Sequence, residues 1–160
     1  MKDIEIICRI RILNETELSE GDKILIEKAK QAAKISYAPY SKFHVGAAIR
    51  LADGTLITGN NQENAAYPSG LCAERTALFH ANANYPDMAV NELAIAAYTN
   101  EKYLRTPITP CGACLQVMLE TEIRFNHTIR ILLYGTEKTY EIIGVKNLLP
   151  LQFCDESLNG

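Results

Sequence analysis

Residues His44–Gly59 read HVGAAIRLADGTLITG, two apolar runs on either side of the pair Asp53-Gly54. An Asp-Gly pair in this setting is a strong signal for a tight hairpin turn, because glycine readily adopts the positive φ that such turns need. We therefore predict two strands, over His44–Leu51 and Thr55–Gly59, that pair antiparallel.

The segments around this hairpin alternate between helical and strand-like patterns. Apolar residues recur at helical spacing from about Asp22 to Tyr37, and Pro39 disfavours helical geometry at the residue before it. Beyond the hairpin we predict a helix, a strand, a helix and two strands, at Cys72–Asn84, Leu93–Tyr98, Cys111–Glu120, Ile129–Tyr134 and Tyr140–Val145. Strands that alternate with helices pair in parallel through crossovers. The prediction is an α/β fold in three layers, α/β/α, whose mixed sheet of about five strands has an antiparallel hairpin followed by parallel strands.

The first twenty residues form an extension with a pattern of its own. Ile4, Ile6, Cys8, Ile10 and Ile12 alternate with mostly polar residues, which is the period of a half-buried strand. We predict an edge strand within residues 1–20. No linker, repeat or change of composition divides the chain, so we expect one domain over residues 1–160.

Composition excludes several classes of protein. The chain of 160 residues is 48% hydrophobic and 22% charged, which is typical of a globular protein and excludes disordered and coiled-coil chains. With 16 Lys and Arg against 19 Asp and Glu the net charge is −3, so we expect no nucleic-acid partner. No apolar run is long enough to span a membrane, and acidic residues stand near the start, so we expect a cytoplasmic protein without membrane contact.

The cysteines carry the clearest chemical signal. Their number, five, is odd, which in a cytoplasmic chain favours metal binding or thiol chemistry over disulfides. Cys72 begins one predicted helix, and Cys111 and Cys114 begin the next. Helix starts that follow strands of an α/β sheet lie at one edge, so the three sulfurs are expected to converge. Three protein ligands with a fourth position open to water define a catalytic zinc site.

Two neighbouring side chains suit such a site. Glu74 lies two positions from a predicted ligand, near enough to pass protons between a metal-activated water and a substrate. Arg75 could donate hydrogen bonds to the sulfurs and offset their negative charge. Taken alone, Glu74 would be interpreted as an ordinary acidic residue and Arg75 as a solvated arginine, each in the first turn of a helix.

The pattern Cys-Ala-Glu followed by Pro-Cys-x-x-Cys resembles the signature of the zinc deaminases, with cysteine as the first ligand. The resemblance is to the cytidine deaminase family, in its short, homotetrameric type that acts on free nucleosides, and extends from about Asp22 to Phe153. Its motifs are Pro39–Ala48, Asn61–Pro68, Cys72–Leu78 and Pro110–Cys114. Leu115 stands where related sequences commonly have arginine, which leaves subunit contacts and fine substrate preference open.

This resemblance implies a zinc-dependent hydrolase of pyrimidine salvage. Cys72, Cys111 and Cys114 would hold one Zn²⁺, whose activated hydroxide attacks the amine-bearing ring carbon, while Glu74 is the catalytic proton shuttle. Cytidine and deoxycytidine would yield uridine and deoxyuridine plus ammonia, without an organic cofactor. The substrate-binding residues would be Phe43, Asn61, Glu63, Tyr67, Ala73 and Phe153, with Tyr67 and Phe153 supplied across subunit contacts of a homotetramer.

Three other interpretations stay open at the level of sequence. A closed structural zinc site would need a fourth ligand such as Cys154, His44, His80 or His127. A thiol oxidoreductase would use the Cys-x-x-Cys pair alone and leave Glu74 unexplained. A blasticidin-type deaminase has similar metal motifs.

Overall fold

The predicted hairpin is present at the centre of the protein, in a computed structural model that describes residues 1–159. Strands β2 (His44–Leu51) and β3 (Leu56–Asn60) pair antiparallel, with Ala48 opposite Thr58. Gly54 in the turn has a φ of 90°, a conformation that favours glycine. The predicted turn and the predicted antiparallel pairing are therefore both present.

The hairpin belongs to a seven-stranded mixed sheet with the order β1-β7-β6-β4-β2-β3. Strand β4 (Val90–Thr99) pairs antiparallel with β2 and parallel with β6 (Arg130–Tyr134), and β7 (Thr139–Ile143) returns antiparallel to β6. Short β1 (Arg11–Leu13) and β5 (Lys102–Tyr103) pair with β7 and β4. These two short strands raise the number of strands above the five expected.

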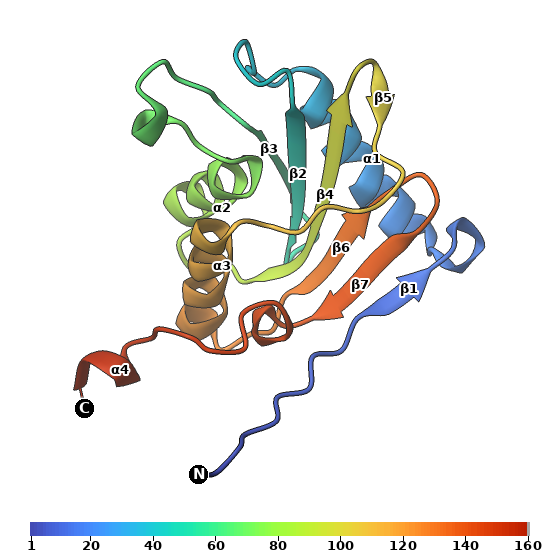
Figure 1. Cartoon of the computed structure of the whole chain (residues 1–160). Coiled ribbons are helices and arrows are strands. Elements are labelled where there is room, and N and C mark those ends of the chain that lie inside the picture. Colours follow the sequence, from blue (N-terminus) through green and yellow to red (C-terminus); the bar gives the residue numbers. More distant parts are fainter. Residues whose placement is uncertain (160) are drawn as a thin grey trace.

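Helices cover both faces of the sheet, which confirms the three-layer α/β/α prediction. Helix α1 (Glu20–Lys34) lies on one face, and α2 (Ala73–Asn84) and α3 (Gly112–Phe125) lie on the other (Figure 1). Side chains of β2 alternate between the two cores: Ala47 and Ile49 pack with α2 and α3, whereas Ala48 packs with α1. The remaining helical turns are η1 (Glu15–Glu17), η2 (Tyr67–Ser69), η3 (Val145–Asn147) and α4 (Glu156–Asn159).

The crossovers bring the starts of α2 and α3 together. Both β3 and β4 are antiparallel to β2 and so run in the same direction, and β6 is parallel to β4. Each of α2 and α3 therefore begins beyond the same edge of the sheet, where ligand sites of α/β folds are found.

The predicted N-terminal edge strand is much shorter in the structure. The expectation of strand structure from Ile4 onward is wrong, because only Arg11–Leu13 pairs, with residues Glu141, Tyr140 and Thr139 of β7. Residues 1–10 are exposed, and the backbone amide of Arg9 donates instead to Asn147 Oδ1 at 3.0 Å. Figure 1 shows this segment leaving the body as an extended tail.

An ion-pair network ties the edge of the sheet to α1. Arg130 Nε donates to Glu141 at 2.7 Å, and its Nη1 contacts both Asp22 of α1 and Glu92 of β4. Arg11 of β1 reaches the second oxygen of Glu141 at 2.6 Å. Since Asp22 and Glu141 are buried, these hydrogen bonds compensate for their removal from water. Within residues 1–159, no helix has the length and apolar character needed to cross a membrane.

Candidate active site

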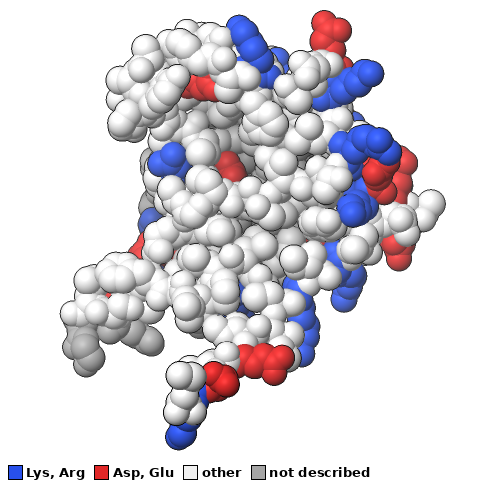
Figure 2. Space-filling model, viewed as in Figure 1, with Lys and Arg blue, Asp and Glu red and all other residues white. Residues whose placement is uncertain are grey.

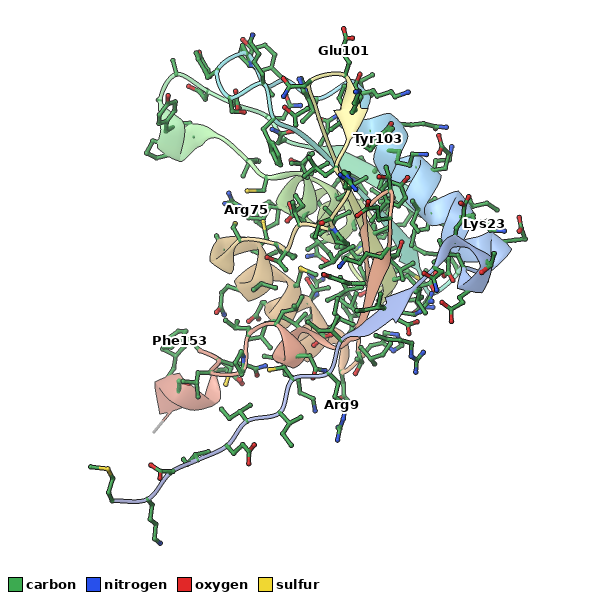
Figure 3. All side chains as sticks on the ribbon, turned by 45° about the vertical axis from the view of Figure 1, so that its right-hand side comes forward. Arg9, Lys23, Arg75, Glu101, Tyr103 and Phe153 are labelled. Carbon is green, nitrogen blue, oxygen red and sulfur yellow. The ribbon has the colours of Figure 1, made fainter. Side chains whose placement is uncertain are left out.

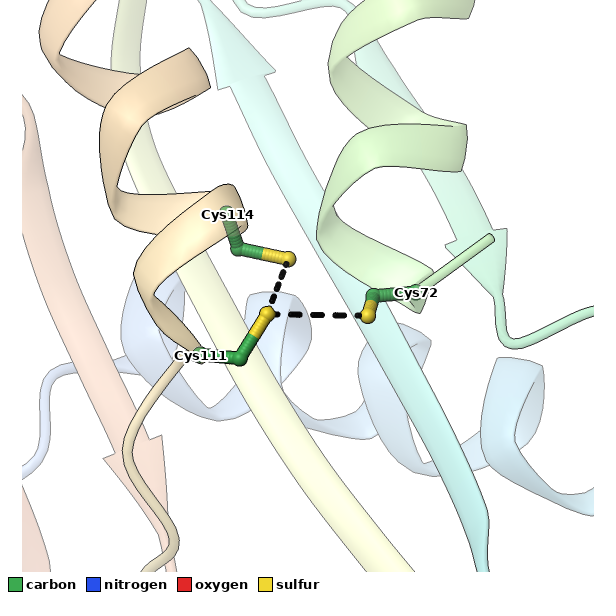
Figure 4. A group of neighbouring side chains, drawn as sticks. All are labelled: Cys72, Cys111 and Cys114. Atoms are coloured by element: carbon green, nitrogen blue, oxygen red, sulfur yellow. Dashed lines mark hydrogen bonds between the residues drawn. The ribbon is translucent and has the colours of Figure 1, made fainter. Parts of the chain in front are cut away.

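Three cysteine sulfurs meet where α2 and α3 begin. Cys72 and Cys111 are the residues that cap these two helices, and Cys114 lies in the first turn of α3. The distances from Cys111 Sγ are 3.8 Å to Cys72 Sγ and 3.5 Å to Cys114 Sγ (Figure 4). All three are free thiols rather than partners in a disulfide.

The spacing of the sulfurs suits a tetrahedral zinc ion. Zinc binds thiolate sulfur at about 2.3 Å, which places two sulfurs of a tetrahedron about 3.8 Å apart. The sulfur atoms all lie within 4.8 Å of one another. Among the side chains that the structure describes, no fourth histidine, cysteine or carboxylate joins the group. The residues present therefore fit a three-ligand metal site and offer no closed structural one.

The thiols of the cluster differ in acidity. A hydrogen bond from the Cys114 thiol, together with Arg75, lowers the pKa of Cys72 to about 5. The same hydrogen bond and burial raise the pKa of the Cys114 thiol. The positive ends of two helices also favour a thiolate here.

Arg75 lies against this cluster, in the first turn of α2. Its Nη2 donates to Cys72 Sγ at 3.7 Å, and this hydrogen bond raises the pKa of Arg75. Its Nε is buried without a hydrogen-bond partner among the described residues. Figure 3 shows Arg75 beside the sulfur atoms. A guanidinium in this position can offset the negative charge of several thiolates.

Glu74 is a buried carboxyl group beside the sulfurs. Only 5% of its surface is exposed, and burial raises the pKa of Glu74. It lines the same cavity as Cys72 and Cys111. A carboxyl group with a raised pKa binds a proton more readily than a solvated one and can still release it, which suits acid–base catalysis.

A cavity of about 710 Å³ opens over the cluster, and its size is that of a small-molecule site. In Figure 2 this face is hollowed, with white surface around recessed acidic atoms. Of the predicted substrate-binding residues, five line the cavity: Phe43, Asn61, Glu63, Tyr67 and Ala73. Phe153 is not among the lining residues; it is exposed, near α4, and its carbonyl accepts from Gln116 Nε2 at 2.8 Å (Figure 3).

Asn61 and Glu63 also hold the cavity wall together. Asn61 Oδ1 accepts from the amide of Val45 at 2.8 Å, and its Nδ2 donates to the carbonyl of Phe43 at 2.9 Å. Among the residues that the structure describes, each end of the amide keeps one hydrogen-bonding position without a partner. Glu63 accepts from the amide of Tyr40 at 2.9 Å and from the hydroxyl of Ser41.

Ser41 is a cavity residue to which sequence reasoning assigned no role. Its hydrogen bond holds the pKa of Glu63 below the usual range. The one feature of the sequence that could have pointed to Ser41 is its place in the segment Pro39–Ala48, which carries part of the family resemblance.

Comparison with known proteins assigns the family. A sequence model described as the cytidine and deoxycytidylate deaminase zinc-binding region matches residues 19–127. The chain belongs to the cytidine and deoxycytidylate deaminase family. Membership makes it a deaminase, which is a hydrolase, rather than a thiol oxidoreductase.

Two relatives and one solved structure match this deaminase over most of their length. The cytidine deaminase of Halalkalibacterium halodurans is 41% identical over 86% of this chain and 97% of its own. The cytidine deaminase of Sporosarcina psychrophila is 40% identical over 84% and 93%. Among solved structures, cytidine deaminase from Burkholderia pseudomallei has a TM-score of 0.71 and 38% identity, over 85% of this chain and 100% of that one.

Proposed function

We propose that this deaminase converts cytidine and deoxycytidine to uridine and deoxyuridine with release of ammonia, in cytoplasmic pyrimidine salvage. The observation that carries the proposal is the three-sulfur cluster beside a buried carboxyl group in a nucleoside-sized cavity. The names of the relatives support the substrate. We further propose one deaminase domain over residues 1–160, with residues 1–20 as its extension, assembled as a homotetramer.

Cys72, Cys111 and Cys114 would hold one zinc ion. Bound zinc supplies Lewis-acid activation of water at neutral pH. Arg75, through its hydrogen bond to Cys72, withdraws negative charge from the sulfurs and so keeps the ligand set compatible with that activation.

Glu74 would move the protons of the reaction. Its carboxylate would accept a proton from the attacking water and give it to the ring nitrogen next to the amine-bearing carbon. It would then accept a second proton, from the new hydroxyl group on that carbon, and give it to the departing amine, which leaves as ammonia. Burial beside the cluster excludes bulk water from this transfer.

The cavity wall would select a nucleoside. Asn61 keeps a free donor and a free acceptor, which suit a sugar hydroxyl, and Glu63 can accept from a second hydroxyl. Phe43, Tyr67 and Ala73 offer apolar surface to the base and sugar. Phe153 would reach the cavity of a neighbouring subunit.

The decisive experiment is ultraviolet absorbance of zinc-quantified protein with cytidine, deoxycytidine and cytosine. We expect turnover of both nucleosides with one zinc per chain. Glu74→Gln keeps the shape of the side chain, and should retain zinc while turnover falls by about 10²–10⁴-fold. Cys111→Ala should instead lose the metal.

Two outcomes would contradict the proposal. Normal turnover by a zinc-loaded Glu74→Gln variant would show that Glu74 does not transfer the protons of the reaction. Zinc-loaded parent protein that leaves all three compounds unchanged would indicate another aminated substrate, such as that of a blasticidin-type deaminase.

A further inference from the structure

The tail before β1 has two chemically different faces. Successive side chains of an extended chain point to opposite sides. From position 3 to position 12 the even positions are all apolar, and the odd positions are charged except for Ile7; these are Ile4, Ile6, Cys8, Ile10 and Ile12 on one side and Asp3, Glu5, Ile7, Arg9 and Arg11 on the other. Lys2, before this stretch, is a charged residue at an even position.

This tail leaves large apolar side chains in water. Ile4 is 88% exposed, Ile7 68% and Ile12 58%. Within the described chain, residues 1–10 form no strand pairing, and the outer edge of β1 is the edge of the sheet. In Figure 2 the tail extends below the body with acidic and basic side chains along it. An unpaired strand with an apolar face is a template for pairing with another strand.

The charges of the tail indicate which partner strand can pair with it. The acidic residues Asp3 and Glu5 come first, and the basic residues Arg9 and Arg11 follow. An antiparallel copy of the same tail, centred on Ile7, sets Glu5 opposite Arg9 and Asp3 opposite Arg11. Arg11 is exposed and also contacts Glu141 of its own chain, so it would be shared between two carboxylates, and Lys2 comes opposite Ile12. By two-fold symmetry each pair occurs twice. Parallel pairing in register would instead place like charges side by side, which is destabilising.

We propose that residues 1–13 pair antiparallel with residues 1–13 of a second copy of this chain, with Ile7 facing Ile7. The two-stranded ribbon joins β1 and β7 of one copy to β1 and β7 of the other in one continuous sheet. All even-numbered apolar residues from Ile4 to Ile12 then lie on one face of this ribbon. An isolated hairpin of this size is marginal, but here each strand is anchored in a folded sheet.

Other registers satisfy the charges less well. If the two tails are centred on Cys8, Glu5 opposite Arg11 is the one type of ion pair that forms, and Ile7 lies opposite Arg9. If they are centred on Ile6, the one type of ion pair is Asp3 opposite Arg9. An axis between two residues places charged side chains opposite apolar ones, because opposite residues share a face.

Disulfide cross-linking distinguishes these registers. In a zinc-loaded Cys8→Ser/Cys154→Ser background, Ile7→Cys places two thiols directly opposite, within the Cα separation that a disulfide accepts. In the matched control, with Cys154→Ser alone, the two Cys8 residues lie about 8 Å apart across the ribbon, too far for a disulfide. With a mild oxidant we expect a cross-linked dimer from Ile7→Cys, at least about tenfold faster than from Cys8.

A charge swap tests whether the ion pairs hold the register. Glu5→Arg in the Ile7→Cys protein places arginine opposite Arg9, and should slow cross-linking about tenfold because the like charges meet twice. Adding Arg9→Glu restores opposite charges and should restore the rate. All these positions are exposed in the tail, so the body of the protein keeps its fold.

Several results would overturn the proposal. If Glu5→Arg does not change the rate of cross-linking, the ion pairs do not hold the two tails in register. If Cys8 cross-links faster than Ile7→Cys, the tails pair in another register. Protection of the tail from protease, in protein that does not cross-link through Ile7→Cys, would place the tail against its own chain.

Discussion

Polar side chains of the cavity are already bonded to their own chain before substrate arrives. Glu63 accepts from Ser41 and from the amide of Tyr40, and these bonds fix the direction of its carboxylate. On the proposed function, this fixed direction reduces the entropy that Glu63 must lose when it binds a sugar.

Ser41→Ala tests this orientation. We expect KM for cytidine to rise several-fold with little change in kcat or zinc content, since only the binding group is loosened. Thr55→Ala is the matched control, because it removes a 3.0 Å bond from a hydroxyl to the Asp53 carboxylate in a turn outside the cavity. Equal KM values for the parent, Ser41→Ala and Thr55→Ala would show that Ser41 does not position Glu63.

Single residues were predictable where chemistry restricts the choice of side chain. Metal binding limits the options to a few residue types, so the spacing of Cys72, Cys111 and Cys114 predicted a cluster that the structure brings together. The hydrogen bond of Ser41 to Glu63 spans 22 positions and depends on how two loops approach each other. No local pattern encodes that approach.

The close contact between β3 and α2 fixes the position of two site residues. A Cβ atom on Gly59 would lie 2.4 Å from the amide nitrogen of Ala77 and 2.6 Å from the carbonyl oxygen of Ala73. Helix α2 can therefore lie against β3 only because residue 59 has no side chain, and the start of α2 carries Cys72 and Glu74.

Gly59→Ala should force α2 away from the sheet. We expect the free energy of unfolding to fall by about 1–3 kcal/mol, as for other overpacked cores, measured by urea denaturation of the zinc-loaded protein. Gly112→Ala is the control, because a Cβ there meets no atom within 4 Å. A Gly59→Ala protein as stable as the Gly112→Ala protein would contradict this account.

Helices and strands of the centre were predicted better than those of the edges. The hairpin and the two crossovers carry strong periodicity and turn signals, and all of them are present. The alternation from Ile4 to Ile12 predicts a strand correctly only where a partner exists, and β7 offers pairing to Arg11–Leu13 alone. Strand length at an edge depends on the neighbour, which the local sequence does not specify.

At the scale of the whole molecule, Arg130 connects α1 with three strands. Burial alone would raise the pKa of Asp22, but hydrogen bonds from Arg130 and Ser19 outweigh it and hold that pKa below its usual value. A group whose pKa is lower in the folded state contributes stability above its unfolded pKa of about 3.9, and this contribution is lost as the pH falls through the folded value.

Asp22→Asn should therefore lower stability at pH 7 by about 1–3 kcal/mol and weaken its decline on acidification below about pH 4. Unfolding free energies measured from pH 7 to pH 3 test this. Glu20→Gln is the control, since its pairing with Lys23 is exposed and contributes little. If the unfolding free energy of Asp22→Asn depends on pH as that of the parent does, protonation of Asp22 does not contribute to the loss of stability in acid.

The sulfur cluster joins parts of the chain that are far apart in sequence. Cys72 and Cys111 are 39 positions apart, and the whole of β4 lies between them. On the proposed function, a metal on all three sulfurs would join the two ends of this loop, whose closure costs conformational entropy that folding has already met. The three sulfurs lie together because β4 pairs with β2 and α3 follows it. A chain that carried its metal would thus be one whose central strand has been assembled.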